Sequence, residues 1–301
     1  MLSAPLLILA MPGITAWWPL LFIALIPLFS TLGRLSTKQS VYTGLICGLA
    51  YYTGLLYWII PVLKRYGGLH PALCAAALFA LATYMAIYLA LFCLGANYML
   101  AQSSSRGKSV TLLLLIAPTL WVGLDFLRSI LFTGIPWMDL GYALYRQPLL
   151  IQAADLGGHH LITFAVVLVN ALFFWVLNKI HASLSAASTG SDYHFTFPVV
   201  VFLLLACLGG YSVLRYQQIS SETATANTAF ISAIQGNIEQ HLKWSPGQKE
   251  KTVDTYLSLS DQVIQDGKEG NKPDLLVWPE TALPFYPARE PLMKKIKNFV
   301  R

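Results

Sequence analysis

Long apolar runs separated by short polar loops occupy the first 216 residues of this 301-residue chain. A helix needs about 20 predominantly apolar residues to cross the hydrocarbon core of a bilayer. The third, fourth and seventh runs reach that length, the fifth and sixth are marginal, and the first two form either short spans or one broken hairpin. The pattern therefore predicts about seven membrane segments, at residues 2–11, 17–32, 41–60, 72–100, 110–127, 161–177 and 195–214.

Small residues recur within these segments. Gly44 and Gly48 are separated by three residues, and residues 75–82 are rich in alanine. Small residues at such spacing let two helices approach closely in lipid. We therefore expect an α-helical multi-span membrane bundle.

The pattern changes after residue 214. Residues 217–227 are polar and rich in Ser and Thr, as in a linker. A short apolar strand follows at 228–234, then a helix at 246–266 and a second apolar strand at 275–278. Strand, helix and strand in this order predict a βαβ unit with parallel strands. The expected organisation is thus a bundle over 1–216, a linker over 217–227 and an α/β domain over 228–301.

Composition supports this division. Hydrophobic residues make up 56% of the chain and charged residues 11%, against about 25% charged in soluble domains. Residues 1–216 hold 10 Lys/Arg and 4 Asp/Glu, whereas the rest holds 10 of each. A water-soluble fold is excluded for most of the chain. Because the basic residues flank apolar runs and the tail is neutral, we expect no nucleic-acid partner.

The loop charges give a weak indication of topology. Five Lys/Arg fall on one side of a seven-segment bundle and four on the other. Basic residues favour the cytoplasmic side. With an odd number of spans, this predicts a cytoplasmic N-terminus and a tail on the outer face.

The cysteines show no metal or redox pattern. None is part of a C-x-x-C pair and none lies in the tail. We predict that they pack as small apolar residues, at Cys47, Cys74, Cys93 and Cys207.

The connection from residue 128 to 160 is the most unusual stretch of the bundle. Asp125 and Arg128, three residues apart on one helix, predict an ion pair. Trp137 and Tyr142, next to Gly and Pro, are typical either of an aromatic belt or of a functional loop in the membrane interface. The adjacent His159 and His160 are expected to begin a helix rather than to bind a metal, since neighbouring residues on a helix point apart.

Glu280 follows the second predicted strand. In parallel α/β folds the carboxyl ends of strands carry the chemistry. Trp278 and Pro279 beside it predict partial desolvation, which suits a general base. A strand-end carboxylate that caps the next turn is an equally good interpretation of these residues.

Several separate motifs then point to one family. The chain resembles the N-terminal portion of the bacterial apolipoprotein N-acyltransferases, membrane enzymes whose catalytic domain is a nitrilase-like α/β sandwich. The motifs extend over most of the chain in the family's order: Phe126-Leu-Arg128, Gly134-x-Pro-Trp137, Gly141-Tyr142, Thr163-Phe164, Asn170, Gln235-Gly-Asn-Ile238, Gln240-His-Leu-Lys243-Trp244 and Val277-Trp-Pro-Glu-Thr-Ala-Leu-Pro284.

This resemblance implies transfer of a fatty acyl chain from a phospholipid to the amine of the diacylglyceryl-modified N-terminal cysteine of an apolipoprotein. A Glu, Lys and Cys triad would act through a thioester, with Glu280 as general base, and Trp244 would lie near the bound lipid. The resemblance implies the bacterial inner membrane, with the tail facing the periplasm. Neither a cofactor nor a metal is expected.

Two departures from the family bear on activity. Asp125 stands where the family usually has Glu. The chain also ends at Arg301, before the part where the family's Lys and Cys would lie, and no tail residue matches them. We therefore expect an N-terminal fragment that is inactive alone.

Two other classes of protein are compatible with a membrane bundle. The chain could be a non-catalytic remnant or a membrane lipid-binding partner of a second polypeptide. A transporter is disfavoured, because no charged residue falls in the middle of a predicted span and no corresponding pair of broken helices is evident.

Overall fold

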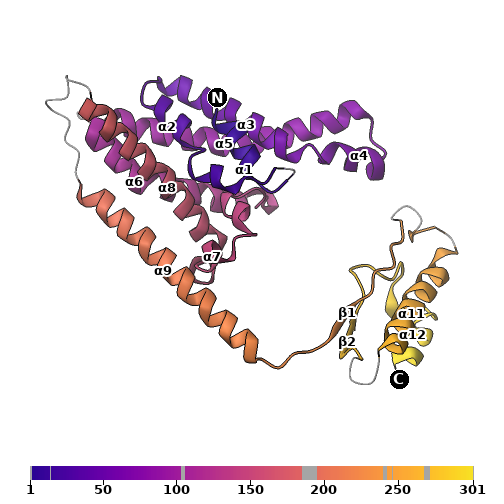
Figure 1. The fold of residues 1–301 in the computed structure, drawn as a ribbon. Coiled ribbons are helices and arrows are strands. Elements are labelled where there is room, and N and C mark those ends of the chain that lie inside the picture. Colours follow the sequence, from indigo (N-terminus) through magenta and orange to yellow (C-terminus); the bar gives the residue numbers. More distant parts are fainter. Residues whose placement is uncertain are drawn as a thin grey trace. The chain divides into compact units, whose positions relative to one another are not determined.

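The computed structural model describes residues 2–13, 15–102, 106–184, 195–239, 243–245, 247–267 and 272–300. These form two compact units, Met1–Ser221 and Glu222–Arg301. The first is built from helices and the second from helices and two short strands (Figure 1).

The first unit contains long helices joined by short helical turns. The long helices are apolar on nearly all faces, whereas the first two apolar runs are divided into short pieces by prolines and glycine. The elements are α1 (Ser3–Ala10), η1 (Trp18–Phe22), α2 (Ile26–Leu32), α3 (Thr37–Leu56), α4 (Ile59–Gly67), α5 (Pro71–Gln102), α6 (Arg106–Ile130), η2 (Leu131–Thr133), η3 (Leu140–Leu144), α7 (Pro148–Ile151), α8 (Ala154–Leu184) and α9 (Thr196–Thr225).

Four of the described helices are long and apolar enough to cross a membrane: α5, α6, α8 and α9. The pair α3 and α4, bent by 50° at a short break, would be a fifth. The segments predicted at 2–11 and 17–32 are not long helices. Pro19 and Pro27 lie in the first turns of η1 and α2, where proline favours the start of a new helix. The membrane character of the chain is confirmed, with fewer long spans than the seven runs predicted.

Helices α3 and α5 pack closely along their lengths, and glycines make this possible. A Cβ atom at Gly44 would lie 2.6 Å from the Cα of Ala90, and one at Gly48 would lie 2.8 Å from the Cα of Ala86. No side chain fits at either distance. The close helix approach predicted from the glycine spacing is confirmed.

Two buried asparagines connect the helices to the N-terminal turns. Asn170 of α8 donates to the carbonyl of Leu21 at 2.8 Å and accepts from the amide of Leu25 at 2.9 Å. Asn97 of α5 donates to the carbonyls of Leu32 and Leu35 at 2.7 and 2.9 Å. These side chains satisfy backbone groups that the interrupted helices leave unpaired. Asn170, one of the family's motif residues, thus has a structural role.

The second unit has the predicted strand, helix, strand order. Strand β1 (Ile231–Ala233) pairs in parallel with β2 (Leu275–Val277), with Ile231 opposite Leu275. Helix α11 (Gln248–Asp266) connects them, and η4 (Pro287–Arg289) and α12 (Met293–Val300) follow. Ile234, Tyr256 and Ala282 form a small core. The parallel βαβ unit is confirmed, but a sandwich is not present among the described residues.

The predicted linker and cysteines have mixed outcomes. The division between the two units falls after Ser221, within the predicted linker 217–227, but α9 continues as a helix to Thr225. No Gly or Pro interrupts the chain there, so the helix does not end where its apolar run ends. Three cysteines are buried as predicted, whereas Cys207 on α9 is exposed.

Candidate functional site

The tail residues predicted to act are placed at one edge of the two-stranded sheet. Glu280 follows β2 by three residues and is exposed. Trp278 is held by its indole N–H, which donates to the Ser260 hydroxyl at 3.0 Å, and by stacking on Tyr256. The turn that carries Glu280 is therefore fixed on α11. The predicted partial desolvation of Glu280 is wrong, because Glu280 and the adjacent Pro279 are both exposed.

Trp244 belongs to the segment that follows β1, and 62% of its surface is exposed. Its neighbour Lys243 is buried, and the Lys243 Nζ donates to the Thr281 hydroxyl at 3.1 Å. Because Thr281 follows Glu280, this bond joins the segment of Trp244 to the turn of Glu280. Lys243 belongs to the motif at residues 240–244, of which residues 240–242 lie outside the described residues.

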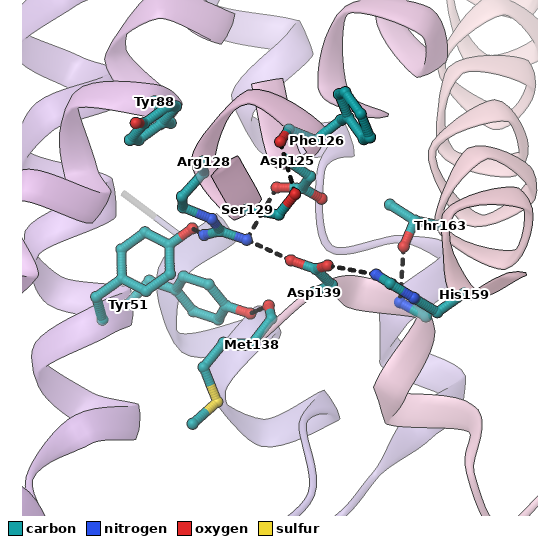
Figure 2. A network of polar contacts seen from close by, with 12 residues as sticks. Tyr51, Tyr88, Asp125, Phe126, Arg128, Ser129, Met138, Asp139, His159 and Thr163 are labelled. Atoms are coloured by element: carbon teal, nitrogen blue, oxygen red, sulfur yellow. Dashed lines mark hydrogen bonds and ion pairs between the residues drawn. The ribbon is translucent and has the colours of Figure 1, made fainter. Parts of the chain in front are cut away.

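A second candidate site lies in the first unit, around Arg128 near the end of α6 (Figure 2). The guanidinium is completely buried and donates to the Asp125 carboxylate at 3.1 Å and to the Tyr52 hydroxyl at 2.6 Å. It also pairs with Asp139, which comes from the connection between η2 and η3. The ion pair predicted between Asp125 and Arg128 is confirmed. Asp139 and Tyr52 were not predicted, because their contacts join distant parts of the chain.

The network continues from Asp139 to α8. The second carboxylate oxygen of Asp139 lies 2.8 Å from Nε2 of His159 (Figure 2). The ring of Tyr142 stacks on His159 with 4.7 Å between centroids. Burial, together with the charge of Asp139, raises the pKa of Tyr142 above its ordinary value. Tyr142 is therefore a neutral hydroxyl at physiological pH.

Two further bonds fix the connection 134–142 against the bundle. The amide of Gly141 donates to the Thr163 hydroxyl at 3.0 Å, and the hydroxyl of Tyr51 donates to the carbonyl of Met138 at 3.2 Å (Figure 2). A Cβ atom at Gly141 would lie 2.6 Å from the carbonyl oxygen of His159, so the backbone approaches α8 more closely than other residues allow. The quoted motif residues Gly141 and Thr163 thus form one contact.

The pair His159 and His160 differs from its prediction. The helical geometry of α8 is broken at Gly157 and Gly158, so the histidines do follow a helix start. Their ring centroids, however, are only 4.0 Å apart. One ring nitrogen of each lies within 4.8 Å of the other and of a carboxylate oxygen of Asp139. The argument that neighbouring histidines must point apart is therefore wrong for this pair.

Residues 3–172, which include this whole network, match the sequence model of the apolipoprotein N-acyltransferase N-terminal domain. The chain belongs to the apolipoprotein N-acyltransferase family. The family resemblance inferred from the motifs is thereby confirmed. Asp125, Arg128, Asp139 and His159 all belong to the matched domain.

Relatives extend the similarity beyond the matched domain. The chain is 36% identical over 304 residues to the apolipoprotein N-acyltransferase of Geobacter metallireducens, covering 100% of this chain and 54% of the relative. It is 30% identical over 271 residues to that of Vibrio cholerae, covering 90% and 48%, and 28% identical over 257 residues to that of Vibrio vulnificus, covering 85% and 45%. The chain thus spans about half the length of the relatives it matches.

Proposed function

We propose that this chain supplies the membrane bundle and the first part of the catalytic domain of an enzyme that transfers a fatty acyl chain from a phospholipid to the N-terminal diacylglyceryl-cysteine amine of apolipoproteins. One observation carries the proposal: the similarity to relatives named apolipoprotein N-acyltransferase extends over the full chain, including the tail with Glu280. The activity is therefore proposed for the assembled enzyme rather than for these residues alone.

The tail is proposed to begin a nitrilase-like sandwich. In each strand the two end residues are exposed and the central residue is only half-buried. A two-stranded sheet is marginally stable on its own, and its uncovered faces favour further strands and layers. The parallel pairing of β1 with β2 supports this arrangement, because both carboxyl ends then lie at one edge.

The proposed reaction has two half-reactions. Glu280 accepts the proton of a cysteine thiol, and the thiolate attacks the ester carbonyl of the phospholipid, which forms a thioester and releases a lysophospholipid alkoxide that takes up the proton. The apolipoprotein amine then attacks the thioester carbonyl, Glu280 accepts the amine proton, and the thiol is regenerated as the amide forms. The cysteine and an oxyanion-stabilising lysine are proposed to come from sequence outside these 301 residues.

The positions of Glu280 and Trp244 are compatible with these roles. Glu280 is exposed on a turn fixed by Trp278, so a substrate or a thiol can reach its carboxylate. Trp244 presents a large apolar surface, which suits contact with an acyl chain, and Lys243 fixes its segment to the turn of Glu280. Neither role requires a cofactor.

We place the enzyme in the bacterial inner membrane with its tail in the periplasm, where lipoproteins are matured. The long apolar helices support the membrane location. A reporter enzyme that works only outside the cytoplasm should be active when it is fused after Arg301. A fusion that is active only in the cytoplasm would contradict the proposed side and separate Glu280 from its substrate.

A hybrid enzyme tests the catalytic proposal. The chain is joined to the downstream half of the Geobacter relative and assayed with phospholipid and a diacylglyceryl-cysteine peptide. We expect acyl transfer by the hybrid and at least a 100-fold loss in Glu280→Gln, which removes the base but keeps the shape. Glu290→Gln changes another carboxylate of the same unit and should leave the rate unchanged. Full activity of the Glu280→Gln hybrid would favour a capping role for Glu280.

The second candidate is a non-catalytic membrane protein that binds lipid. A cavity of ≈ 200 Å³ favours it, lined almost wholly by apolar residues of α7, α8 and α9 and neighbouring turns, among them Ile162, Val166, Leu205 and Leu208. This candidate predicts that lipid binds but that no hybrid with a catalytic half transfers acyl chains. Thioester formation in the hybrid would exclude it.

A further inference from the structure

Asp139, His159 and His160 form a cluster of three metal-ligating side chains where the connection 134–142 meets α8. The cluster has no part in the proposed acyl transfer, whose groups lie in the tail. A ligand bound to this cluster would therefore be separate from the acyl-transfer groups.

The ligand atoms are close to the spacing of a metal site. Two ring nitrogens and one carboxylate oxygen lie within 4.8 Å of one another, and the closest pair, His159 Nε2 and the Asp139 oxygen, is 2.8 Å apart. Tetrahedral zinc with bonds of about 2.1 Å holds its ligand atoms roughly 3.4 Å apart. The observed separations lie on both sides of that spacing.

The local charge favours a cation at this point. Two carboxylates, those of Asp125 and Asp139, share the one guanidinium of Arg128. Arg128 and His159 contact different oxygens of Asp139, so the second oxygen is directed at His159 (Figure 2). The positive charge of Arg128 therefore does not occupy the side of Asp139 that would face the ion.

His160 supplies an independent observation. Its Nδ1 atom is buried and has no hydrogen-bond partner among the described residues. A buried polar atom without a partner costs about 1–3 kcal/mol, and such atoms are rare in folded proteins. A bound ion would satisfy the His160 ring.

We propose that Asp139, His159 and His160 together bind one zinc ion. Two imidazoles and one carboxylate favour zinc over Mg²⁺ and Ca²⁺, which prefer oxygen ligands. Three protein ligands leave a fourth position for water, and the side chain of His159, 31% exposed, opens the cluster to solvent. The ion would clamp the connection 134–142 to the start of α8, in addition to the contacts of Arg128 and Thr163.

The test uses the purified 301-residue chain in detergent, stripped of metal and then dialysed against dilute zinc or Mg²⁺. The decisive variant is His160→Ala, because no polar contact of His160 among the described residues is lost and the pairs of Asp139 with Arg128 and His159 remain. His181→Ala changes another histidine of α8 and is the matched control. Bound metal is counted by mass spectrometry, and the melting temperature is measured with and without the ion.

We expect one zinc and no magnesium per wild-type chain, and zinc should raise its melting temperature. His160→Ala should bind zinc at least tenfold more weakly and lose the shift, whereas His181→Ala should behave as wild type. Absence of bound zinc in the wild type would overturn the proposal, and so would equal zinc binding by His160→Ala. If zinc instead depends on His181, the site is elsewhere and the proposal fails.

Discussion

Replacing Arg128 by methionine should destabilise the first unit strongly. The side chain is completely buried and is shared by Asp125, Asp139 and Tyr52. Methionine keeps much of the volume but removes the guanidinium charge that faces both carboxylates. Breaking a buried ion pair by removing one partner typically costs about 3–5 kcal/mol, because the other partner stays buried and uncompensated.

Protonation of a carboxylate sets an upper limit on this loss of stability. A carboxylate that loses its counter-ion takes up a proton when remaining charged is more costly, and protonating a carboxylate of ordinary acidity at pH 7 costs about 4 kcal/mol. We therefore expect a loss of roughly 3–5 kcal/mol at pH 7. Since the folded variant then holds one proton more than the unfolded chain, it should regain about 1.4 kcal/mol per pH unit as the pH falls from 7 to 5.

The assay is unfolding of the chain in mixed micelles by increasing denaturing detergent, followed by tryptophan fluorescence at pH 7, 6 and 5. Arg34→Met removes an exposed arginine and should change stability by less than about 0.5 kcal/mol. The combined variant Asp125→Leu, Arg128→Met and Asp139→Leu should recover most of the loss, since no buried charge remains. An Arg128→Met chain within 1 kcal/mol of wild type, or one with no pH response, would refute this account of the network.

Three further outcomes are expected. Gly44→Leu should lower the unfolding free energy by about 2 kcal/mol or more in the same assay, because it forces α3 away from α5. Gly209→Ala is the control and should be tolerated, since a Cβ atom there would have no atom within 4 Å. Equal effects of the two variants would show that the close approach of α3 and α5 does not determine stability. Asn170→Ala should lower the unfolding free energy by about 1–3 kcal/mol, because it leaves the Leu21 carbonyl and the Leu25 amide without their side-chain partner. An unchanged midpoint of the unfolding curve would contradict this. A cysteine at the exposed Thr133 should react with an impermeant thiol reagent from the periplasmic side of intact cells, and labelling only from the cytoplasm would reverse the proposed topology.

Local patterns predicted the features that depend on near neighbours in the sequence. The spacing of Gly44 and Gly48 indicated a close helix approach, and the spacing of Asp125 and Arg128 indicated an ion pair, because residues three or four apart share one helix face. The strand, helix, strand order of the tail likewise follows from its apolar pattern. These predictions required no knowledge of which segments meet.

Contacts between distant segments could not be predicted in this way. Tyr52 and Arg128 are 76 residues apart, and no periodicity records that α3 and α6 bring them together. Asp139 looked like one polar residue in an aromatic loop until the fold placed it between Arg128 and His159. The histidine prediction failed because it assumed regular helix, whereas Gly158 adopts a positive φ of 64° just before the pair.

The length of α5 has a consequence for its surroundings in a membrane. With 32 residues and a rise of 1.5 Å per residue, α5 is about 48 Å long, against about 30 Å of hydrocarbon. Even a tilt of 40°, at the upper end of what such helices adopt, leaves about 7 Å outside the core. Hydrophobic mismatch is therefore built into this helix. A thicker bilayer will cover more of α5, and a thinner one will expose more of it to the headgroups.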